Sequence, residues 1–228
     1  THFDPGGFAE YIRVPRINVE LGTLRIPDSM TFDEGSFIEP LACVVRAQRF
    51  ADIGPGQTVL VIGSGISGLL HLQLARARGA ARIIATDISE YRLNAAKRFG
   101  ADGIINGAEH VPARLREGNE ARLADRVIVC TGAMPGIQQA IKSLDRGATL
   151  LFFAPTAAAI DVPIPLFDFW RDEIKVVTSY AGSGADLQES LRLISERKVR
   201  VGEMVTHRLP LAQAELGIVG IEQAHAAD

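Results

Sequence analysis

The sequence predicts an α/β protein built on a doubly wound parallel sheet. From residue 58 onwards, short apolar runs alternate with helical stretches. The apolar runs are TVLVIG, RIIATD, GIIN, DRVIVCTG and ATLLFFAP. Runs without a polar face are typical of strands that helices bury on both sides. Three of the helical stretches are followed by a glycine, the usual left-handed residue after a helix end. We therefore expect a Rossmann-type sheet.

The helices between these strands are predicted from the same alternation. We expect them over 66–78, 90–99 and 136–146, with a weaker and more polar helix inside 109–124. Beyond residue 160 the runs IDVPI, IKVVTSY and MVTHRLP predict further strands, and a helix is predicted across 184–197. Strands alternating with helices favour right-handed crossovers in one sheet.

The first part of the chain has a different character. Residues 1–30 are rich in glycine, proline and short β-prone runs, which predicts strands and turns without helix. Thr31 and Glu34 then have capping-box spacing, which marks a helix start. Pro40 predicts a break near Glu39 and a new helix beginning there, because proline is tolerated only in the first turn.

Composition narrows the class of protein. The 228 residues carry 24 Lys and Arg against 27 Asp and Glu, a net charge of −3, which does not favour nucleic acid as a partner. No apolar run is long enough to span a bilayer, and the polar start is not a signal peptide. Cys43 and Cys130 fit a reduced cytosolic protein, although a bridge between them stays open. The opening Thr1 suggests a piece of a longer chain.

The most informative motif is Gly63-Ser64-Gly65-Ile66-Ser67-Gly68, between a predicted strand and a predicted helix. Gly63 allows a tight turn, Gly65 leaves room for a pyrophosphate, and Gly68 lets the helix pack closely on the strand. The free N–H groups at the helix start then face the phosphates. We expect this loop to bind the cofactor through Gly63, Gly65, Ile66, Ser67 and Gly68.

Asp87 strengthens the prediction because it ends the next strand, 19 residues after Gly68. A carboxylate there can accept hydrogen bonds from both adenosine ribose hydroxyls and would repel a 2′-phosphate, which favours NAD over NADP. Arg92 could stack on the adenine or neutralise Asp87, which leaves some tolerance for NADP. The alternative is that Asp87 only caps the helix that follows, but Ser89 is the better cap candidate.

Two other functions compete with an NAD-dependent enzyme. A methyltransferase using S-adenosylmethionine also has a glycine-rich turn after its first strand and an acidic residue after its second. The complete glycine spacing and the strand predicted beyond residue 150 count against it. A non-catalytic NAD-binding or dimerisation module is the second alternative, and the sequence excludes it less well.

Several segments together resemble the zinc-dependent medium-chain alcohol dehydrogenase family, especially its polyol (sorbitol) and threonine dehydrogenase branch. They occur in the family's order: GGFAEYIRVP, FIEPLACVVRA, GPGQTVLVIGSGISG, ATDISEYRLNAAKRFGAD, VIVCTGA and VTHRLPL. The resemblance implies three parts. Residues 1–40 would be the end of a β-rich GroES-like catalytic domain, 41–185 the NAD-binding Rossmann domain, and 186–228 a helix and strand returning to the catalytic domain.

The resemblance also implies a zinc site of which little is present. The family's first zinc ligands, a Cys and a Gly-His-Glu segment, would lie upstream of Thr1. Glu39 matches a glutamate beside the metal and is expected to bind the zinc directly or through water. Read from its own surroundings, Glu39 is equally natural as a carboxylate at a helix start. Cys43 and His71 are expected to be packing residues.

Further site residues are implied in the same way. Ser67 would pack near the cofactor, and Thr131 would line its cleft. The nicotinamide end would contact Phe153, Ala154, Pro155, Thr178 and Ser179. Tyr180 would contact the substrate and is the second candidate catalytic residue beside Glu39. Sorbitol-type enzymes often have an arginine where Ser179 stands, which puts a polyol-specific function in doubt.

The activity implied is the NAD-dependent, zinc-assisted oxidation of a secondary alcohol to a ketone by hydride transfer. The substrate would be a polyol, a sugar alcohol or a hydroxy-amino acid. The given polypeptide is expected to bind NAD and to catalyse poorly, because most zinc ligands would lie outside it. The family commonly forms homodimers or homotetramers, and the run AIDVPI is the candidate edge strand for pairing.

Overall fold

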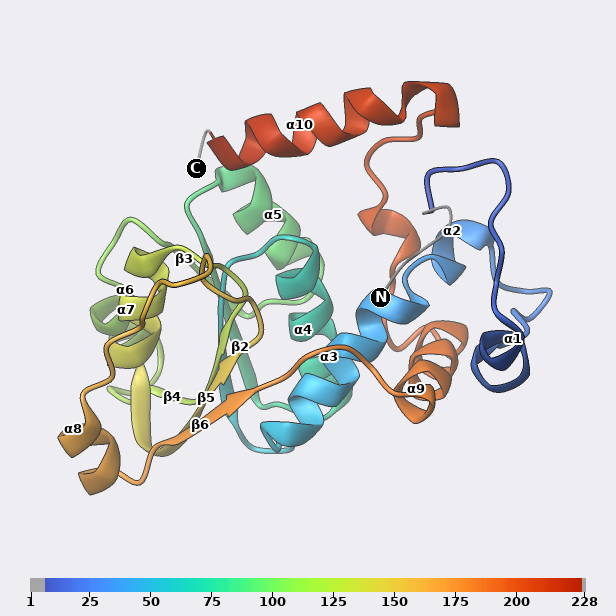
Figure 1. Ribbon diagram of the computed structural model, residues 1–228. Coiled ribbons are helices and arrows are strands. Elements are labelled where there is room, and N and C mark those ends of the chain that lie inside the picture. Colours follow the sequence, from blue (N-terminus) through green and yellow to red (C-terminus); the bar gives the residue numbers. More distant parts are fainter. Residues whose placement is uncertain (1–6, 227–228) are drawn as a thin grey trace.

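The computed structural model describes residues 7–226 and confirms the doubly wound parallel sheet (Figure 1). Six strands lie in the order β3-β2-β1-β4-β5-β6, and every neighbouring pair is parallel. The strands are β1 (Thr58–Ile62), β2 (Arg82–Asp87), β3 (Gly103–Asn106), β4 (Ala124–Val129), β5 (Leu144–Phe152) and β6 (Lys175–Thr178). The strand order reverses between β1 and β4, which is where such sheets bind ligands.

Helices cover both faces of the sheet (Figure 1). One face is covered by α3 (Ile38–Phe50), α4 (Ile66–Ala77) and α5 (Glu90–Arg98), and the other by α6 (Val111–Gly118), α7 (Met134–Lys142) and α8 (Leu166–Arg171). Successive side chains of a strand point to opposite faces. Accordingly Val59 and Val61 of β1 join the first apolar cluster, while Leu60 and Ile62 join the second.

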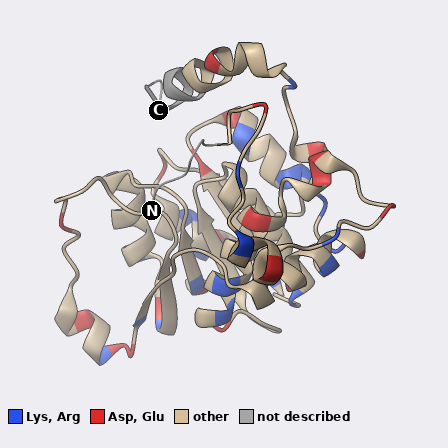
Figure 2. Cartoon of the chain, turned by 45° about the vertical axis from the view of Figure 1, so that its right-hand side comes forward, with Lys and Arg blue, Asp and Glu red and all other residues tan. Residues whose placement is uncertain are grey.

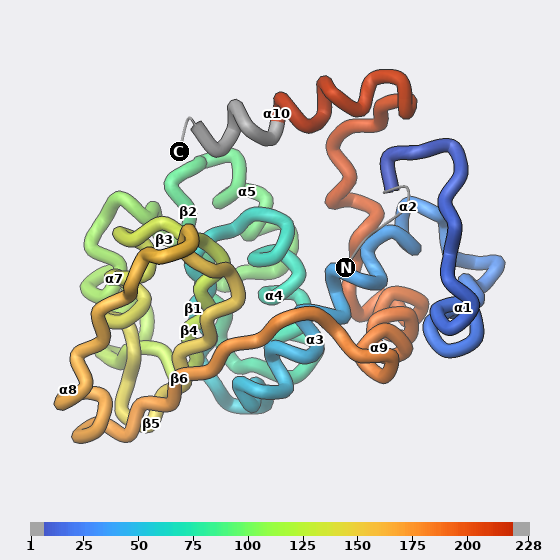
Figure 3. The backbone as a smooth tube through the Cα atoms, in the orientation of Figure 1, coloured from blue at the N-terminus to red at the C-terminus, as the bar shows by residue number. Residues whose placement is uncertain are grey.

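A second layer lies outside α3. Helix α9 (Gly184–Ser195) packs against α3, and both contribute to a third apolar cluster together with α4. Buried Asp186 of α9 lies 3.1 Å from the Arg49 guanidinium of α3. The tube in Figure 3 shows the chain leaving α9 through η1 (Gly202–Met204) and η2 (Leu211–Gln213) to α10 (Ala214–Ala226).

The helix starts near Glu39 are as predicted. Thr31 and Glu34 form the expected capping box at the start of α2 (Phe32–Gly35), with the Glu34 N–H donating to Thr31 Oγ1 at 3.2 Å. The chain then breaks and begins α3 at Ile38, which leaves Pro40 in the first turn. The predicted helix across 184–197 is also confirmed as α9.

Three local predictions were wrong. Residues 1–30 were expected to lack helix, but α1 (Arg16–Gly22) follows Pro15, with an ion pair of 2.6 Å between Arg16 and Glu20 on successive turns. The β-prone runs 160–164 and 204–210 form no strand. Strand propensity alone does not make a strand without a neighbour to pair with, so the edge strand expected in AIDVPI is absent and β6 is the edge on that side.

Two helix ends were also misplaced. The helix predicted over 136–146 is α7, which ends at Lys142. Gly147 does not cap a helix, but lies inside β5 with a φ of +71°. The weaker helix in 109–124 is the shorter α6, whose start is capped by the His110 side chain accepting from the Ala113 N–H at 3.2 Å.

Charged residues of both signs are interspersed over the elements in Figure 2, in keeping with the small net charge. Within residues 7–226, no helix is both long and apolar enough to cross a bilayer.

Candidate nucleotide site

The glycine motif forms the turn between β1 and α4, and its first glycine is required by the backbone. Gly63 has a φ of +93°, a backbone conformation that residues with a Cβ rarely adopt. Its N–H donates to Thr86 O of β2 at 3.0 Å. A Cβ at this position would lie 3.1 Å from the carbonyl oxygen of Cys130, the residue after β4. The turn is therefore held against both neighbouring strands.

The other two glycines serve different purposes, as the motif predicts. A Cβ on Gly68 would overlap the Gly63 carbonyl oxygen, so the absence of a side chain allows α4 to approach β1. A Cβ on Gly65 would meet no atom within 4 Å. Gly65 is the N-cap of α4, and no side chain accepts a hydrogen bond from the helix start. The turn thus presents open space in front of unpaired backbone N–H groups, which suits an anion.

Asp87 lies at the mouth of this turn, where the sequence predicted it. Its Oδ2 accepts from the Ser64 N–H at 2.8 Å, and its Oδ1 accepts from the Ser89 N–H at 3.0 Å. Its side chain is 5% exposed. The carboxylate therefore braces the glycine turn from β2. Ser89 is the N-cap of α5 as expected, but its own side chain makes no cap hydrogen bond.

Arg92 is close enough to moderate the charge of Asp87. Its Nη1 lies 3.8 Å from Asp87 Oδ1, and its side chain is 31% exposed. This arrangement supports the expectation that Arg92 neutralises Asp87 in part. Stacking of Arg92 on an adenine stays a prediction.

The loops after β4 and β5 meet the glycine turn at the same edge of the sheet. A Cβ on Gly63 would lie 3.5 Å from Thr131 Cβ, and one on Gly132 would lie 2.7 Å from Pro155 O. The N–H groups of Phe153 and Ala154 both donate to Val129 O, at 3.1 and 3.0 Å. The structure thus brings together the cofactor residues predicted on three loops: Gly63, Gly65, Ile66, Ser67, Gly68, Thr131, Phe153, Ala154 and Pro155.

His71 belongs to the surroundings of this site, although the sequence predicted only a packing residue. It is fully buried on α4, its ring lies edge-on to Phe153 with centroids 4.5 Å apart, and its Nδ1 is 3.2 Å from Gln48 Nε2. Its Nε2 has no partner. Burial, and then the Arg78 charge, lower the pKa of His71 from 6.5 to about 3. The signal in the sequence was its position among four leucines of α4.

The residues expected nearer the substrate form a looser group. Thr178 pairs with Phe152 at the end of β6, Ser179 has a buried hydroxyl oxygen without a partner, and Tyr180 is 94% exposed. A Cβ on Gly182 would lie 2.8 Å from the Ala42 side chain. The segment after β6 therefore runs against the first half of α3, the helix that carries Glu39.

Glu39 is exposed in the first turn of α3, and its neighbour is a cysteine. The Cys43 thiol donates to Glu39 Oε1 at 3.3 Å. Burial, followed by this hydrogen bond, raises the pKa of Cys43 to about 11. Cys43 and Cys130 are both free, which closes the question of a bridge between them.

A zinc ion does not fit the described residues on their own. Between residues 7 and 226, no three His, Cys, Asp or Glu side chains gather closely enough to hold a metal. Structural zinc usually has four protein ligands and catalytic zinc three. Glu39 therefore stands as a single candidate ligand, and no catalytic step can be assigned to a metal within this part of the chain.

The sheet order and the glycine turn define a Rossmann-type domain, and comparisons with known proteins specify the family. The zinc-binding dehydrogenase family matches residues 67–196. Sorbitol dehydrogenase of Mus musculus is 33% identical over 193 residues, which is 83% of this chain and 53% of that protein. The human enzyme is 34% identical over the same shares. The chain belongs to the zinc-binding dehydrogenase family and spans about half the length of these relatives.

Solved structures agree with this assignment. A chain described as a zinc-binding dehydrogenase from Sinorhizobium meliloti 1021, bound to NADP, is 28% identical with a TM-score of 0.84 and covers 92% of this chain and 61% of its own. Galactitol-1-phosphate dehydrogenase from Escherichia coli is 29% identical with a TM-score of 0.78, covering 89% and 60%. The fold is therefore shared over nearly the whole chain.

Proposed function

We propose that this chain is the cofactor-binding part of an NAD-dependent dehydrogenase. The reaction is oxidation of a secondary alcohol to a ketone by hydride transfer, and the substrate is a polyol, a sugar alcohol or a hydroxy-amino acid. Family membership and the sorbitol dehydrogenase relatives support the reaction class. The substrate range rests on the same relatives and on galactitol-1-phosphate dehydrogenase.

One observation carries the cofactor proposal, namely the open space in front of Gly65 next to the Asp87 carboxylate. A pyrophosphate there receives hydrogen bonds from the free N–H groups at the start of α4. The ribose hydroxyls donate to Asp87, whose second lone pairs remain available beyond the bonds from Ser64 and Ser89. Ile66 and Ser67 line the same space. NAD supplies the acceptor for the hydride when it is bound.

We infer that NAD is preferred over NADP. The Asp87 carboxylate repels a 2′-phosphate, while Arg92 at 3.8 Å weakens that repulsion and leaves some tolerance for NADP. The Sinorhizobium meliloti structure carries NADP, so the preference within the family has to be measured for each member. The nicotinamide is assigned to Phe153, Ala154, Pro155, Thr178 and Ser179.

The remaining proposals concern the catalytic half. Glu39 is an accessory zinc ligand and Tyr180 a substrate contact, with the other metal ligands outside the described residues. The polypeptide 1–228 therefore binds NAD with little or no turnover by itself. Residues 1–40, 41–185 and 186–228 form the three parts expected from the family, the protein is a cytoplasmic homodimer or homotetramer, and its partners include neither nucleic acid nor membrane.

Calorimetric titration with NADH, NADPH and S-adenosylmethionine tests the proposal. We expect saturable binding of NADH, weaker binding of NADPH and no binding of S-adenosylmethionine. Asp87→Ala should weaken NADH binding by about 1–3 kcal/mol, because hydrogen bonds to a charged acceptor disappear. Wild-type affinity in that variant would make Asp87 a purely structural brace, and failure to bind NADH would remove the cofactor proposal.

A second candidate is a non-catalytic NAD-binding or dimerisation module. The absence of a three-ligand metal group within residues 7–226 favours it. Zinc content measured by mass spectrometry on the whole natural protein, together with alcohol oxidation by it, separates the two. Stoichiometric zinc and NAD reduction would support the enzyme. The absence of both would support the non-catalytic module.

A further inference from the structure

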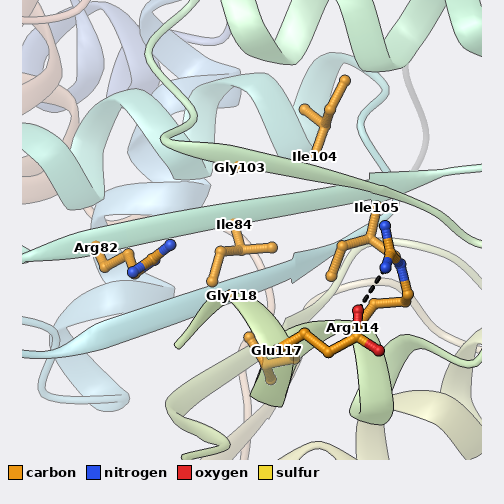
Figure 4. Close-up of a pocket in the computed structure, with 9 residues that line it drawn as sticks. Arg82, Ile84, Gly103, Ile104, Ile105, Arg114, Glu117 and Gly118 are labelled. Carbon is orange, nitrogen blue, oxygen red and sulfur yellow. Dashed lines mark hydrogen bonds and ion pairs between the residues drawn. The ribbon is translucent and has the colours of Figure 1, made fainter. Parts of the chain in front are cut away.

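A crevice lies at the β3 edge of the sheet, at the amino ends of the strands. It has a volume of about 280 Å³ and lies between α6 and the neighbouring strands β2 and β3 (Figure 4). Arg82 begins β2 and Gly103 begins β3. The glycine turn follows the opposite, carboxyl end of β1, so the crevice is separate from the proposed NAD site.

Arg82 is the unusual residue of this crevice. Its Nε is buried and has no hydrogen-bond partner, and among the described residues its guanidinium forms no ion pair or hydrogen bond. Buried polar groups nearly always have a partner, and leaving one unmade costs free energy. Within residues 7–226 the chain therefore provides no hydrogen-bond acceptor for the Arg82 guanidinium.

The second arginine of the crevice, Arg114, has carboxylate partners within the chain. Arg114 of α6 pairs with Glu109 at 2.9 Å and also with Glu117. Figure 4 shows the Glu117 carboxylate directed at Arg114 and away from Arg82. Arg114 thus already faces two carboxylates of the chain, and Arg82 is the arginine of the crevice that has no carboxylate partner among the described residues.

The walls beside Arg82 are apolar and leave room. Ile84, Ile105 and Leu115 line the crevice and belong to the buried core on this face of the sheet. Gly118 ends α6, and a Cβ there would lie 3.8 Å from Arg82 Nη2. Its missing side chain keeps the space next to the guanidinium open. The crevice thus offers one cation and an aliphatic surface to the same ligand.

We propose that this crevice binds a small monocarboxylate with a short aliphatic body. The carboxylate accepts two hydrogen bonds from the planar guanidinium of Arg82, which matches it in geometry. The aliphatic body lies against Ile84, Ile105 and Leu115. Pockets for drug-sized ligands begin at about 300 Å³, so a volume of about 280 Å³ limits the ligand to a smaller molecule. The proposal is independent of the NAD site.

Titration of ¹⁵N-labelled protein with 4-methylpentanoate tests this site by NMR. We expect saturable shifts of the Gly103 and Gly118 amide signals with a Kd of roughly 1 mM or below, and no shift of the Gly65 signal. The neutral 4-methylpentanol and inorganic phosphate should each bind at least about tenfold more weakly, because the alcohol lacks the carboxylate and phosphate lacks the aliphatic body. Shifts that do not saturate, or phosphate binding as tightly, would overturn the proposal.

Two variants and one matched control locate the ligand. Arg82→Met keeps an apolar side chain of similar reach and should weaken 4-methylpentanoate binding about tenfold. Gly118→Leu should fill the space beside Arg82 and abolish binding. Arg116→Met makes the same change on α6 at an exposed residue outside the crevice and should leave the affinity within about twofold. Unchanged affinity in both Arg82→Met and Gly118→Leu would exclude the crevice.

Discussion

The glycine turn and the Glu39 region differ in how many hydrogen bonds the rest of the chain makes to their polar groups. At the turn, Gly63 N–H donates to Thr86 O, Ser64 N–H donates to Asp87, and the Ser64 hydroxyl donates to Thr86 O at 3.0 Å. Around Glu39, the Cys43 thiol is the one hydrogen-bond partner of the carboxylate within residues 7–226. In the segment after β6, the Ser179 hydroxyl is buried without a partner. Hydrogen bonds to β2 hold the glycine turn, while the space in front of Gly65 stays open. The Glu39 region has no comparable set of hydrogen bonds within residues 7–226.

This difference supports the proposal that nucleotide binding and alcohol oxidation would depend on different parts of the protein. The turn from β1 to α4 is held by hydrogen bonds to β2, so its N–H groups are in fixed positions before a ligand arrives. This lowers the entropic cost of binding. A metal site needs at least three ligands held together, and residues 7–226 do not supply them. Variants in the two regions should therefore have separable effects, as the following predictions specify.

The largest effect is expected at Gly68. In Gly68→Ala the new Cβ overlaps the Gly63 carbonyl, so α4 must move away from β1. We expect a loss of about 2–4 kcal/mol in the free energy of unfolding, because the core between them is close-packed. Urea denaturation followed by circular dichroism measures it. A loss below about 0.5 kcal/mol would mean that the turn is not rigidly held.

Gly65→Ala is the matched variant with the opposite pattern. Its Cβ meets no protein atom, so the free energy of unfolding should fall by less than about 1 kcal/mol, the cost of a poorer N-cap. The methyl group occupies the space assigned to the pyrophosphate, and NADH and ADP-ribose should both bind at least about tenfold more weakly, or about 1.4 kcal/mol. Retained affinity for both would place the pyrophosphate elsewhere.

The difference between the two regions also decided what the sequence could predict. The strands β1, β2 and β4 are mostly buried, and β3 and β5 are buried in part. Helices flank all five, so their apolar runs identify them. The glycine motif could be assigned in advance because each glycine answers a local backbone requirement. Asp87 could be placed at the turn because β1 and β2 are neighbours whose carboxyl ends share one edge. Local sequence rules and the order of strands in the sheet are therefore enough to predict the glycine turn and its surroundings.

The failures occurred where a partner outside the local segment decides the structure. The runs 160–164 and 204–210 have strand composition but no strand beside them. Helix α1 is the exception, because its Arg16–Glu20 ion pair is local. His71 is packed in the core as expected, but its contacts with Phe153, which follows β5, and with Gln48 of α3 depend on three separate elements and were not predicted. Spacing along the chain carries no signal for such contacts. The roles of Glu39 and Tyr180 stay predictions for the same reason.

His71 gives a pH-dependent prediction for the braced half. Burial lowers its pKa to about 3 in the folded protein, against the ordinary 6.5 of a histidine side chain. The unfolded chain therefore takes up a proton between these values that the folded protein does not. Stability falls as the pH drops through this window, and from roughly pH 7 to pH 5 the loss from this one group is about 2 kcal/mol.

The control for this prediction is His71→Leu. The variant is expected to be less stable at neutral pH, because Gln48 loses its partner on the ring. Its unfolding free energy should nevertheless change less with pH than that of the wild type, by about 2 kcal/mol over the same interval. Equal pH dependence of the two proteins would show that His71 can be protonated in place.

The smallest effect is expected from the exposed residues of the other region. Glu39→Gln removes a charge and Tyr180→Phe removes a hydroxyl, each from a side chain that lies outside the glycine turn, and Tyr180 is 94% exposed. NADH affinity measured by calorimetry should stay within about twofold of the wild type, since exposed substitutions away from a binding site change little. A tenfold loss in either variant would join the two regions into one site, because the nucleotide would then have to contact the Tyr180 side chain or the start of α3. The separation of binding from oxidation would fail in that case, whatever the Gly65 and Gly68 variants show.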